Sequence, residues 1–448
     1  MRILVVNGSP KGETSITLQT LLYLKKRFPE HQWSCLHAGR FIAKIEKDPA
    51  EAEAKLAAAD CVLFAYPVYT FFAPSQLHRF IRLMKERGVS LAGKTVSQVT
   101  TSKHFYDTTA QQYVKENAFD LGANVVNGLF ADMDDLTKEE GRKQAEQWFR
   151  QLVFLHENGL FERAPRPHPA FTPVPCPAAE LSEEEKPGDI VVVADMGEED
   201  ANLRAMVERF RAVCPKKTRL INIREFPFKG GCMGCFRCAA DGKCFYTDNF
   251  ADMLRNEIHT AEAVVLAFTV CDHSMGTRFK TYDDRQFCNG HRTVTMGTPF
   301  AYLVSGPLAR EKNLMEVITA RAEVGGNFLA GIATDERDPA GEIAALAKKL
   351  CYAVDEKVVL PKNFYGVGGM RIFRDLIWLM RGMMREDHRF FKAHGQYDFP
   401  QKQRGTVLKM YLVGMLLNNK TLMKKAGGKM TEGMLGPYKK FVGDERFE

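Results

Sequence analysis

The chain has 448 residues, of which 45% are hydrophobic and 26% are charged, a composition typical of a globular protein with roughly two to three domains. Arg2–Asn7 reads as a buried strand, so no signal peptide is expected, and no apolar run reaches the roughly 20 residues of a membrane span. The net charge of +7 arises in residues 361–448, which hold 17 Lys and Arg against 8 Asp and Glu. The charge of the remaining residues, 1–360, gives no reason to expect nucleic-acid binding. The eleven cysteines predict a reducing, cytoplasmic compartment with free thiols or metal ligands rather than disulfides.

Short β-branched runs alternate with amphipathic helical stretches, a pattern that predicts parallel sheets with helices on both faces. Five strands are expected near residues 2–7, 33–37, 61–66, 95–101 and 124–130. Five more are expected near residues 190–195, 218–223, 263–269, 299–305 and 327–333. Such units usually take the flavodoxin-like strand order 2-1-3-4-5. The predicted fold is therefore α/β, with two doubly wound five-stranded parallel sheets and a helical C-terminal tail.

The two sets of strands belong to an internal repeat. Ala59–Val68 matches Ala261–Val270 at an offset of 202 residues, and Gly122–Ala131 matches Gly325–Thr334 at an offset of 203. The first strands are only 187 residues apart. The second copy therefore resembles the first with a longer loop inserted after its second strand.

These boundaries predict four segments. The two repeats are expected at 1–156 and 188–357, joined by a proline-rich linker at 157–187 and followed by a basic, methionine-rich tail at 358–448. Within the tail, apolar side chains recur at helical spacing, which favours docking on the body of the protein. Gly366–Gly369 is expected to form a flexible turn.

The first repeat carries a loop suited to an anion. Its first strand runs into Asn7–Thr17, which combines glycines, hydroxyl side chains and a predicted helix N-terminus. Backbone N–H groups at a helix start favour a phosphate, and Lys11 adds a cation. The residues do not match the P-loop of nucleotide hydrolases. Taken alone, these residues would favour an ordinary βα turn with Ser and Thr caps.

Two further loops follow the third and fourth strands of this repeat, at Tyr66–Pro74 and Thr100–Tyr106. In an open α/β sheet, loops at the carboxyl ends of the strands surround the ligand crevice. Their aromatic side chains and backbone suit a planar ring. Packing of these aromatics into the core is the alternative interpretation.

Four cysteines of the second repeat lie within thirteen residues and are spaced C-x2-C-x2-C-x5-C: Cys232, Cys235, Cys238 and Cys244. Structural zinc usually takes two C-x2-C arms from separate segments, so this compact spacing favours a cuboidal iron–sulfur cluster. Reduced thiols without metal and a zinc site are the alternatives. The second repeat also replaces the phosphate loop with the acidic segment Asp195–Asp200, whose carboxylates would repel a phosphate.

The loop Gly8–Lys11, the helix start Ser15–Thr17 and the segment Pro67–Tyr69 resemble the FMN-binding loops of the flavodoxin-like NAD(P)H-dependent FMN reductase family. The cysteine run resembles that of the iron–sulfur flavoproteins of the same superfamily, which hold a [4Fe–4S] cluster beside FMN. The resemblance covers residues 1–155 and 188–355 and indicates a tandem duplication.

The resemblance implies FMN on the first repeat and a [4Fe–4S] cluster on the four cysteines of the second. The implied FMN-binding residues are Ser9, Lys11, Ser15, Ile16, Thr17, Pro67, Val68, Tyr69, Thr70, Phe71, Thr101, Ser102, Lys103 and His104. Members of the family often pair with FMN near the subunit interface, so we expect the two repeats to form an intrachain pseudo-dimer. Alternatively, the second repeat only caps the FMN site. Homodimerisation is left open.

The expected activity is that of an NAD(P)H-dependent FMN oxidoreductase. Hydride would pass from NAD(P)H to FMN, and electrons would then reach an unknown acceptor, through the cluster where one is bound. No side chain is expected to act as acid or base, because the cofactor carries this chemistry. A non-enzymatic electron carrier or a redox-sensing interaction protein is the alternative function. His104 and His273 are expected to be solvated or hydrogen-bonded.

Overall fold

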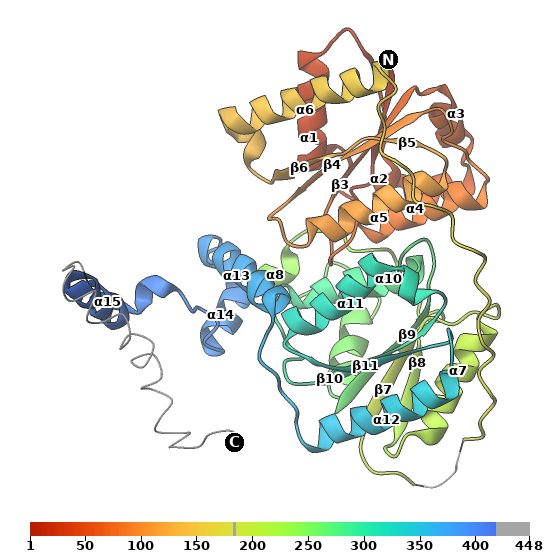
Figure 1. Ribbon diagram of the computed structural model, residues 1–448, viewed down its shortest axis with the longest axis vertical. Coiled ribbons are helices and arrows are strands. Elements are labelled where there is room, and N and C mark those ends of the chain that lie inside the picture. Colours follow the sequence, from red (N-terminus) through yellow and green to blue (C-terminus); the bar gives the residue numbers. More distant parts are fainter. Residues whose placement is uncertain (182–184, 418–448) are drawn as a thin grey trace. The chain divides into compact units, whose positions relative to one another are not determined.

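The computed structural model describes residues 1–181 and 185–417. The chain divides into two compact units, Met1–Phe390 and Phe391–Glu448. The larger unit contains two parallel sheets with flanking helices (Figure 1). Among the described helices, none combines the length and the apolar character that crossing a lipid bilayer requires.

The first sheet has the order β2-β1-β3-β4-β5, and β6 also pairs with β4. Its strands are β1 Arg2–Asn7, β2 Gln32–Leu36, β3 Cys61–Pro67, β4 Thr95–Ser102, β5 Asn124–Val125 and β6 Leu129–Asp132. The expected fifth strand is therefore split into β5 and β6. Between them, the carbonyl of Asn127 accepts hydrogen bonds from the Ser97 hydroxyl and the Trp148 indole, both at 3.0 Å, so side chains replace the sheet ladder there.

The second sheet has the order β11-β10-β9-β7-β8, which is the order 2-1-3-4-5 read from the opposite edge. Its strands are β7 Ile190–Ala194, β8 Thr218–Asn222, β9 Ala263–Thr269, β10 Pro299–Ser305 and β11 Phe328–Thr334. All strand pairs in both sheets are parallel. The predicted fold class and strand order are confirmed.

The helices follow the same repeat. Those of the first repeat are α1 Ile16–Arg27, α2 Ala38–Lys47, α3 Ala50–Ala58, α4 Ser75–Glu86, α5 Asp107–Asp120 and α6 Glu139–Glu157. Those of the second are α7 Ala201–Val213, α8 Arg237–Asp241, α9 Phe250–Met253, α10 Thr277–Arg285, α11 Lys312–Gly325 and α12 Pro339–Asp355. The C-terminal helices are α13 Phe364–Leu379, α14 Arg385–Ala393 and α15 Arg404–Leu417.

Alternation along the central strands divides the core into layers. Ile3 and Val5 of β1 pack with α1 and α6 on the outer face of the first sheet. The next residues in register, Leu4 and Val6, face the other way and join a core cluster that also contains Val191 of β7. This cluster runs through α4, α5, α10 and α11, so one continuous apolar core connects the inner faces of the two sheets.

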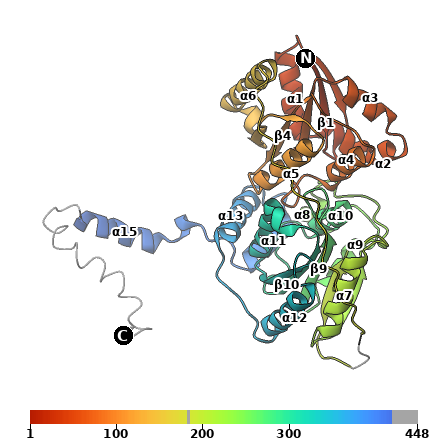
Figure 2. The same ribbon diagram turned by 45° about the vertical axis from the view of Figure 1, so that its right-hand side comes forward.

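Equivalent helices of the two repeats pack on each other between the sheets (Figure 2). α4 lies against α10 and α5 lies against α11. The offset of 202 residues places Ser75, the first residue of α4, at Thr277, the first residue of α10. Such like-to-like packing is the contact that twofold-related subunits make, and it is what an intrachain pseudo-dimer requires.

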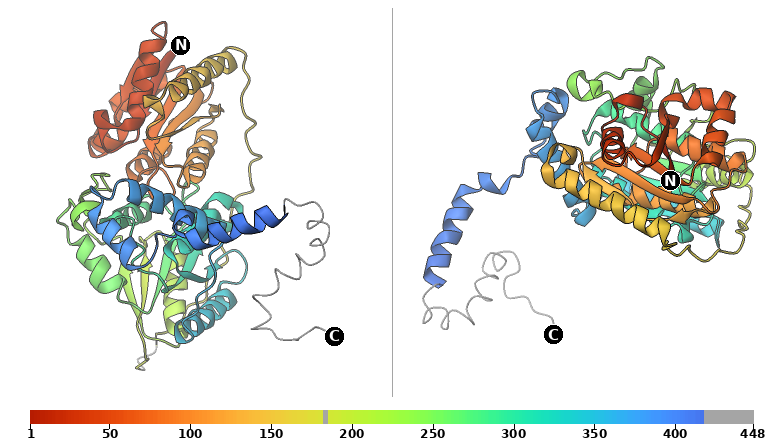
Figure 3. Two further views of the ribbon diagram at one scale, coloured as in Figure 1. Left: turned by 90° about the vertical axis from the view of Figure 1, so that its left-hand side faces the viewer. Right: turned by 90° about the horizontal axis from the view of Figure 1, so that it is seen from above.

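The linker and α13 both lie along the second repeat. The linker runs beside it (Figure 3). In this segment the Val174 N–H donates to the Asp335 carbonyl at 2.8 Å. α13 packs on α11. The expected turn at Gly366–Gly369 is wrong, because these residues belong to α13. Two of the glycines let the helices approach closely: a Cβ at Gly366 would lie 2.8 Å from the Glu323 carbonyl oxygen of α11, and one at Gly369 would lie 2.6 Å from Val324.

Candidate functional site

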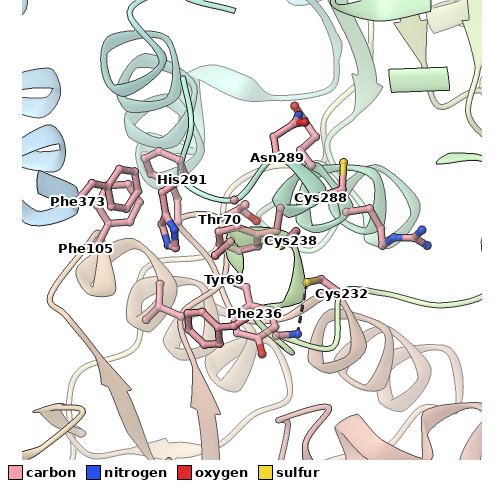
Figure 4. A pocket seen from close by; sticks show the side chains of 18 of the residues that line it. Tyr69, Thr70, Phe105, Cys232, Phe236, Cys238, Cys288, Asn289, His291 and Phe373 are labelled. Atoms are coloured by element: carbon pink, nitrogen blue, oxygen red, sulfur yellow. Dashed lines mark hydrogen bonds between the residues drawn. The ribbon is translucent and has the colours of Figure 1, made fainter. Parts of the chain in front are cut away.

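A cavity of about 340 Å³ lies within the larger unit, where the two repeats meet. The first repeat contributes the loop Asn7–Thr17, here called the phosphate loop, and the loops that follow β3 and β4. The other walls are the cysteine run, residues 285–295 and α13 (Figure 4). Thirteen of the fourteen residues implied for FMN line it, all except His104. All four cysteines of the run line it as well. The structure thus brings both predicted sets of site residues to one cavity.

The phosphate loop is shaped from within by Asn7 at the end of β1. The Asn7 side chain donates to the Gly12 carbonyl at 2.8 Å and accepts from the Ser9 N–H at 3.1 Å. Gly12 has a φ of +58°, which a residue with a side chain rarely adopts. The loop leaves Ser9, Ser15 and Thr17 buried at the start of α1.

One hydroxyl of this loop has no partner. The Ser15 Oγ is buried and makes no hydrogen bond among the described residues, whereas the Thr17 hydroxyl pairs with that of Thr101 at 2.7 Å. A buried polar atom without a partner is costly, and an anion at the N-terminus of a helix would satisfy it. The loop therefore fits the phosphate of FMN.

The loop after β3 is held in an unusual backbone conformation by the second repeat. Thr70 and Phe71 have φ values of +39° and +68°, and such residues persist only where their surroundings fix them. Here Lys280 of α10, which is fully buried, donates to the Tyr69 carbonyl at 2.9 Å and to the Thr70 hydroxyl at 2.6 Å. Asp284, one turn later, accepts from the Ser75 N–H at 2.7 Å.

Two residues of the loop after β4 are less available for binding FMN than predicted. The Lys103 ammonium lines the cavity but is held by Asp132 at 2.6 Å and Asp134 at 3.0 Å. His104 lies outside the cavity lining, and its Nδ1 is 2.8 Å from the Asp107 carboxylate. His104 is therefore hydrogen-bonded, as expected for a histidine without a catalytic role.

The cysteine run lies directly on the first repeat. The Gln76 amide of α4 donates to the Cys232 carbonyl at 3.2 Å. Gly234 has a φ of +60°, and a Cβ at this position would lie 1.9 Å from the Tyr69 hydroxyl. Its N–H points at the Cys232 Sγ at 3.4 Å, the dashed line in Figure 4. Only glycine allows the run to approach Tyr69 this closely.

Lys11 connects the phosphate loop to the cysteine run. Its ammonium lies 5.4 Å from the centroid of the Phe236 ring. Burial lowers the pKa of Lys11, and the thiols of Cys235 and Cys232 act in the opposite direction. Lys11 is thus placed to balance negative charge from either a phosphate or thiolates.

The thiols of the run fit a cationic centre. Burial raises the pKa of Cys232, and it raises the pKa of Cys238 to about 11. These thiols therefore ionise only when a cation compensates for burial, as a metal does. Lys229 precedes the run, and Arg237 and Lys243 lie within it. These cations would offset part of the charge of a thiolate-ligated cluster.

The four sulfurs do not form a preassembled site for a single ion. A tetrahedral zinc ion holds its sulfurs about 2.3 Å away, and therefore less than about 4 Å from one another. In the part of the chain that the structure describes, no three of these four thiols come within 4.8 Å of one another. A multi-iron cluster attaches its thiolates to separate irons and does not require so close an approach.

In the second repeat, the loop equivalent to the phosphate loop is Asp195–Asp200, and one of its own carboxylates occupies the anion position. Asp200 accepts from the Gly197 N–H at 2.9 Å and from the Thr269 hydroxyl at 2.7 Å. Arg224 pairs with Asp195 at 2.7 Å and with Asp200 at 3.4 Å. The backbone donors of this loop are thus already engaged, in line with the prediction that its acidic residues exclude a phosphate.

Several residues of the cavity were not predicted. His291 lines it, and the His291 Nδ1 lies 2.9 Å from the carboxylate of Asp387 on α14. Asp387 is fully buried. Phe373 of α13 stacks on Phe105 with ring centroids 4.3 Å apart. The buried Arg285 pairs with Asp248 at 2.7 Å. Each pair joins residues far apart in the sequence, so no local motif indicates it.

Comparison with known proteins gives the following matches. Residues 1–135 match the family described as NADPH-dependent FMN reductase. An iron–sulfur flavoprotein of Archaeoglobus fulgidus is 24% identical over 175 residues, which are 37% of this chain and 78% of that protein. These matches confirm the resemblance stated from the sequence.

Two solved structures are also similar to part of the chain. An apo NADH:FMN oxidoreductase is 18% identical with a TM-score of 0.30, and the match covers 34% of this chain and 88% of that one. General stress protein 14 of Treponema denticola, solved with FMN, is 13% identical with a TM-score of 0.27, and the match covers 35% of this chain and 99% of that one.

Proposed function

We propose that the chain is a flavin oxidoreductase of the flavodoxin-like FMN reductase superfamily, whose family model residues 1–135 match, and that it couples FMN on the first repeat to a [4Fe–4S] cluster on the second. The observation that supports this most is the shared cavity: the loops implied for FMN and all four cysteines line it together. When bound, FMN supplies hydride acceptance from NAD(P)H and one- or two-electron release.

The residues of the first repeat would bind and orient the flavin. Ser9, Ser15 and the N-terminus of α1 would hold the phosphate, with Ser15 Oγ gaining the partner that it lacks. Tyr69 and Phe71 on the loop after β3 would contact the ring. Because Lys280 and Asp284 hold this loop from the other repeat, the geometry of the flavin site depends on the fused arrangement.

The residues of the second repeat would hold the cluster. Cys232, Cys235, Cys238 and Cys244 are its ligands, and Lys11 reaches toward them from the phosphate loop. The iron–sulfur flavoprotein similar to this chain is in agreement with this proposal. The acceptor that finally receives the electrons would be either a small molecule in the cavity or a protein partner.

The proposal is tested by anaerobic purification, quantification of flavin and iron, and measurement of NADH and NADPH oxidation with an artificial acceptor. We expect one FMN and about four irons per chain, with saturable turnover. Ser9→Asp places a carboxylate against the phosphate and should abolish both flavin retention and turnover. Two flavins per chain, or full flavin retention in Ser9→Asp, would contradict the assignment.

Reduction by NADH and NADPH also distinguishes the proposed enzyme from the alternative function. A non-enzymatic electron carrier would be reduced slowly by NADH and NADPH and rapidly by a protein donor. An enzyme of the proposed class would be reduced by one of the nucleotides within its turnover time. Stopped-flow measurement of flavin reduction under both conditions distinguishes the two.

A further inference from the structure

Two cysteines far from the cavity lie in contact on the outer face of the second sheet. The Cys214 and Cys351 sulfurs are 3.8 Å apart, and the residues are 137 positions apart in the chain. Cys214 directly follows α7, and Cys351 lies within α12, which packs on α7. Cys214 is fully buried and Cys351 is 6% exposed. Neither belongs to the cysteine run.

Two lysines lie near this pair, one of which, Lys216, is ion-paired with Asp355 at 2.8 Å. The Lys186 ammonium donates to the Cys214 carbonyl at 2.9 Å. Lys216 follows two residues after Cys214, and its backbone N–H acts to lower the pKa of both thiols. The two thiols share a hydrogen bond in which either sulfur can be the donor. This contact lowers the pKa of Cys214 and raises that of Cys351, and Lys216 and Lys186 also act to lower the pKa of Cys214, against burial.

We propose that Cys214 and Cys351 form a reversible dithiol–disulfide couple, which a hydroperoxide oxidises. The Cys214 thiolate would attack the peroxide oxygen, breaking the O–O bond and leaving a sulfenic acid while water or an alcohol departs. The Cys351 sulfur would then attack the Cys214 sulfur, forming the S–S bond and releasing water. In total, two thiols lose two electrons and two protons, and the peroxide is reduced.

The geometry allows this bond with a small movement. A disulfide needs its sulfurs about 2.05 Å apart, and they start at 3.8 Å. Cys214 has the extended backbone conformation of a residue beyond the helix end (φ −67°, ψ 126°), so it can shift without unwinding α7. The bond would fix α7 to α12 just before β8, the strand that leads into the cysteine run.

The test uses the full-length protein with its cofactors bound. The protein is treated with hydrogen peroxide at pH 7, remaining thiols are alkylated, and peptides are mapped by mass spectrometry. We expect a Cys214–Cys351 linked peptide that dithiothreitol reverses, and a midpoint of thermal unfolding raised by several degrees. Cys61 is the matched control, because it is equally buried and burial raises its pKa to about 12.

Two variants identify the attacking sulfur. In Cys351→Ser, Cys214 should accumulate as a sulfenic acid that dimedone traps, whereas in Cys214→Ser, Cys351 should stay reduced. Because thiolates are the reactive species, peroxide should oxidise Cys214 faster than the equally buried Cys61. The proposal is overturned if peroxide oxidises the exposed Cys235 but yields no linked peptide, or if Cys61 reacts as fast as Cys214.

Discussion

Arg82 and Asp284 occupy the same position in the two repeats, 202 residues apart, and each contacts the loop after the third strand of the other repeat. Arg82 lies 3.6 Å from the Asp272 carboxylate. Asp284 accepts from the Thr70 hydroxyl at 2.5 Å and from the Ser75 N–H at 2.7 Å. Each repeat thus contacts a loop of the other, but the two contacts differ in burial. Asp284 is fully buried, whereas the Arg82 side chain is 42% exposed.

This inequality predicts different effects of removing the two side chains. Asp284→Ala leaves the buried Lys280 ammonium without its nearest counter-ion, and breaking such a pair costs about 3–5 kcal/mol. Because the Thr70 loop loses its support, flavin occupancy should fall as well. Urea unfolding and flavin content after gel filtration measure both effects.

Arg82→Ala is the matched control at the equivalent position. Its ion pair is partly exposed, so the free energy of unfolding should change by about 0–1 kcal/mol, and flavin content should be unchanged. Equal losses in both variants would show that the two loops depend on the interface to the same degree, contrary to the structure.

The strands and the predicted flavin loops could be identified from the sequence because their signals are local. β-branched runs marked each strand, and Ser9, Ser15 and Thr17 stood together at one helix start. The internal repeat then predicted the second sheet from the first. Such features depend on residues a few positions apart, so a single sequence contains them.

The remaining walls of the cavity depend on contacts between distant segments. His291 and Asp387 are 96 residues apart, and neither lies in a recognisable motif. The positive φ of Thr70 is imposed by Lys280 and Asp284 from the other repeat, so the residue type does not indicate it. Gly369 suggested a turn, but its lack of a side chain serves the packing of two helices.

Ser15 tests the phosphate site. Its Oγ has no partner among the described residues, so Ser15→Ala should leave the stability of the flavin-free protein unchanged. A hydrogen bond to a charged group contributes about 1.5–3 kcal/mol, so the variant should bind FMN about 10- to 100-fold more weakly. Fluorescence titration of the flavin-free protein measures the dissociation constant.

Thr17→Ala is the comparison for Ser15→Ala, because its hydroxyl is already paired with Thr101. Leaving a buried hydroxyl unpaired costs about 1–3 kcal/mol, so this variant should destabilise the protein even without flavin. If Ser15→Ala destabilises the flavin-free protein equally, the Ser15 hydroxyl serves the fold instead of the phosphate.

Cys235→Ser tests the metal. We expect loss of the broad visible absorbance and of most of the iron, with flavin retained because the first repeat holds the phosphate. Cys35→Ser, outside the run, should change neither. Metal analysis that finds stoichiometric zinc instead of iron in the unmodified protein contradicts the assignment. A metal-free protein with unimpaired turnover leaves only the flavin enzyme.

Truncations test the contribution of the tail to the cavity. α13 supplies Ile372, Phe373 and Leu376 to its lining. A chain ending at residue 357 should therefore lose stability and flavin occupancy, and a chain ending at residue 403 should keep its flavin. Flavin content and thermal unfolding of both truncated proteins check this. Equal flavin content in the two would exclude a role for α13 in the site.

The pH dependence of stability reports on His273, which bridges the two repeats. Its Nε2 lies 3.0 Å from Asp120 of α5, and its Nδ1 lies 3.0 Å from Glu311. Burial alone lowers the pKa of His273, but the two carboxylates outweigh it and raise the pKa to about 10. The protonated histidine thus stabilises the folded state.

The sign of this effect fixes the pH window. Because the folded pKa is above the unfolded value of about 6.5, the stabilisation is complete below that pH and is lost as the pH rises toward 10. The free energy of unfolding should fall by on the order of a few kcal/mol between pH 6.5 and 10. In His273→Gln, which cannot be protonated, urea unfolding across the same range should give a much smaller slope. An unchanged slope would assign the dependence to other groups.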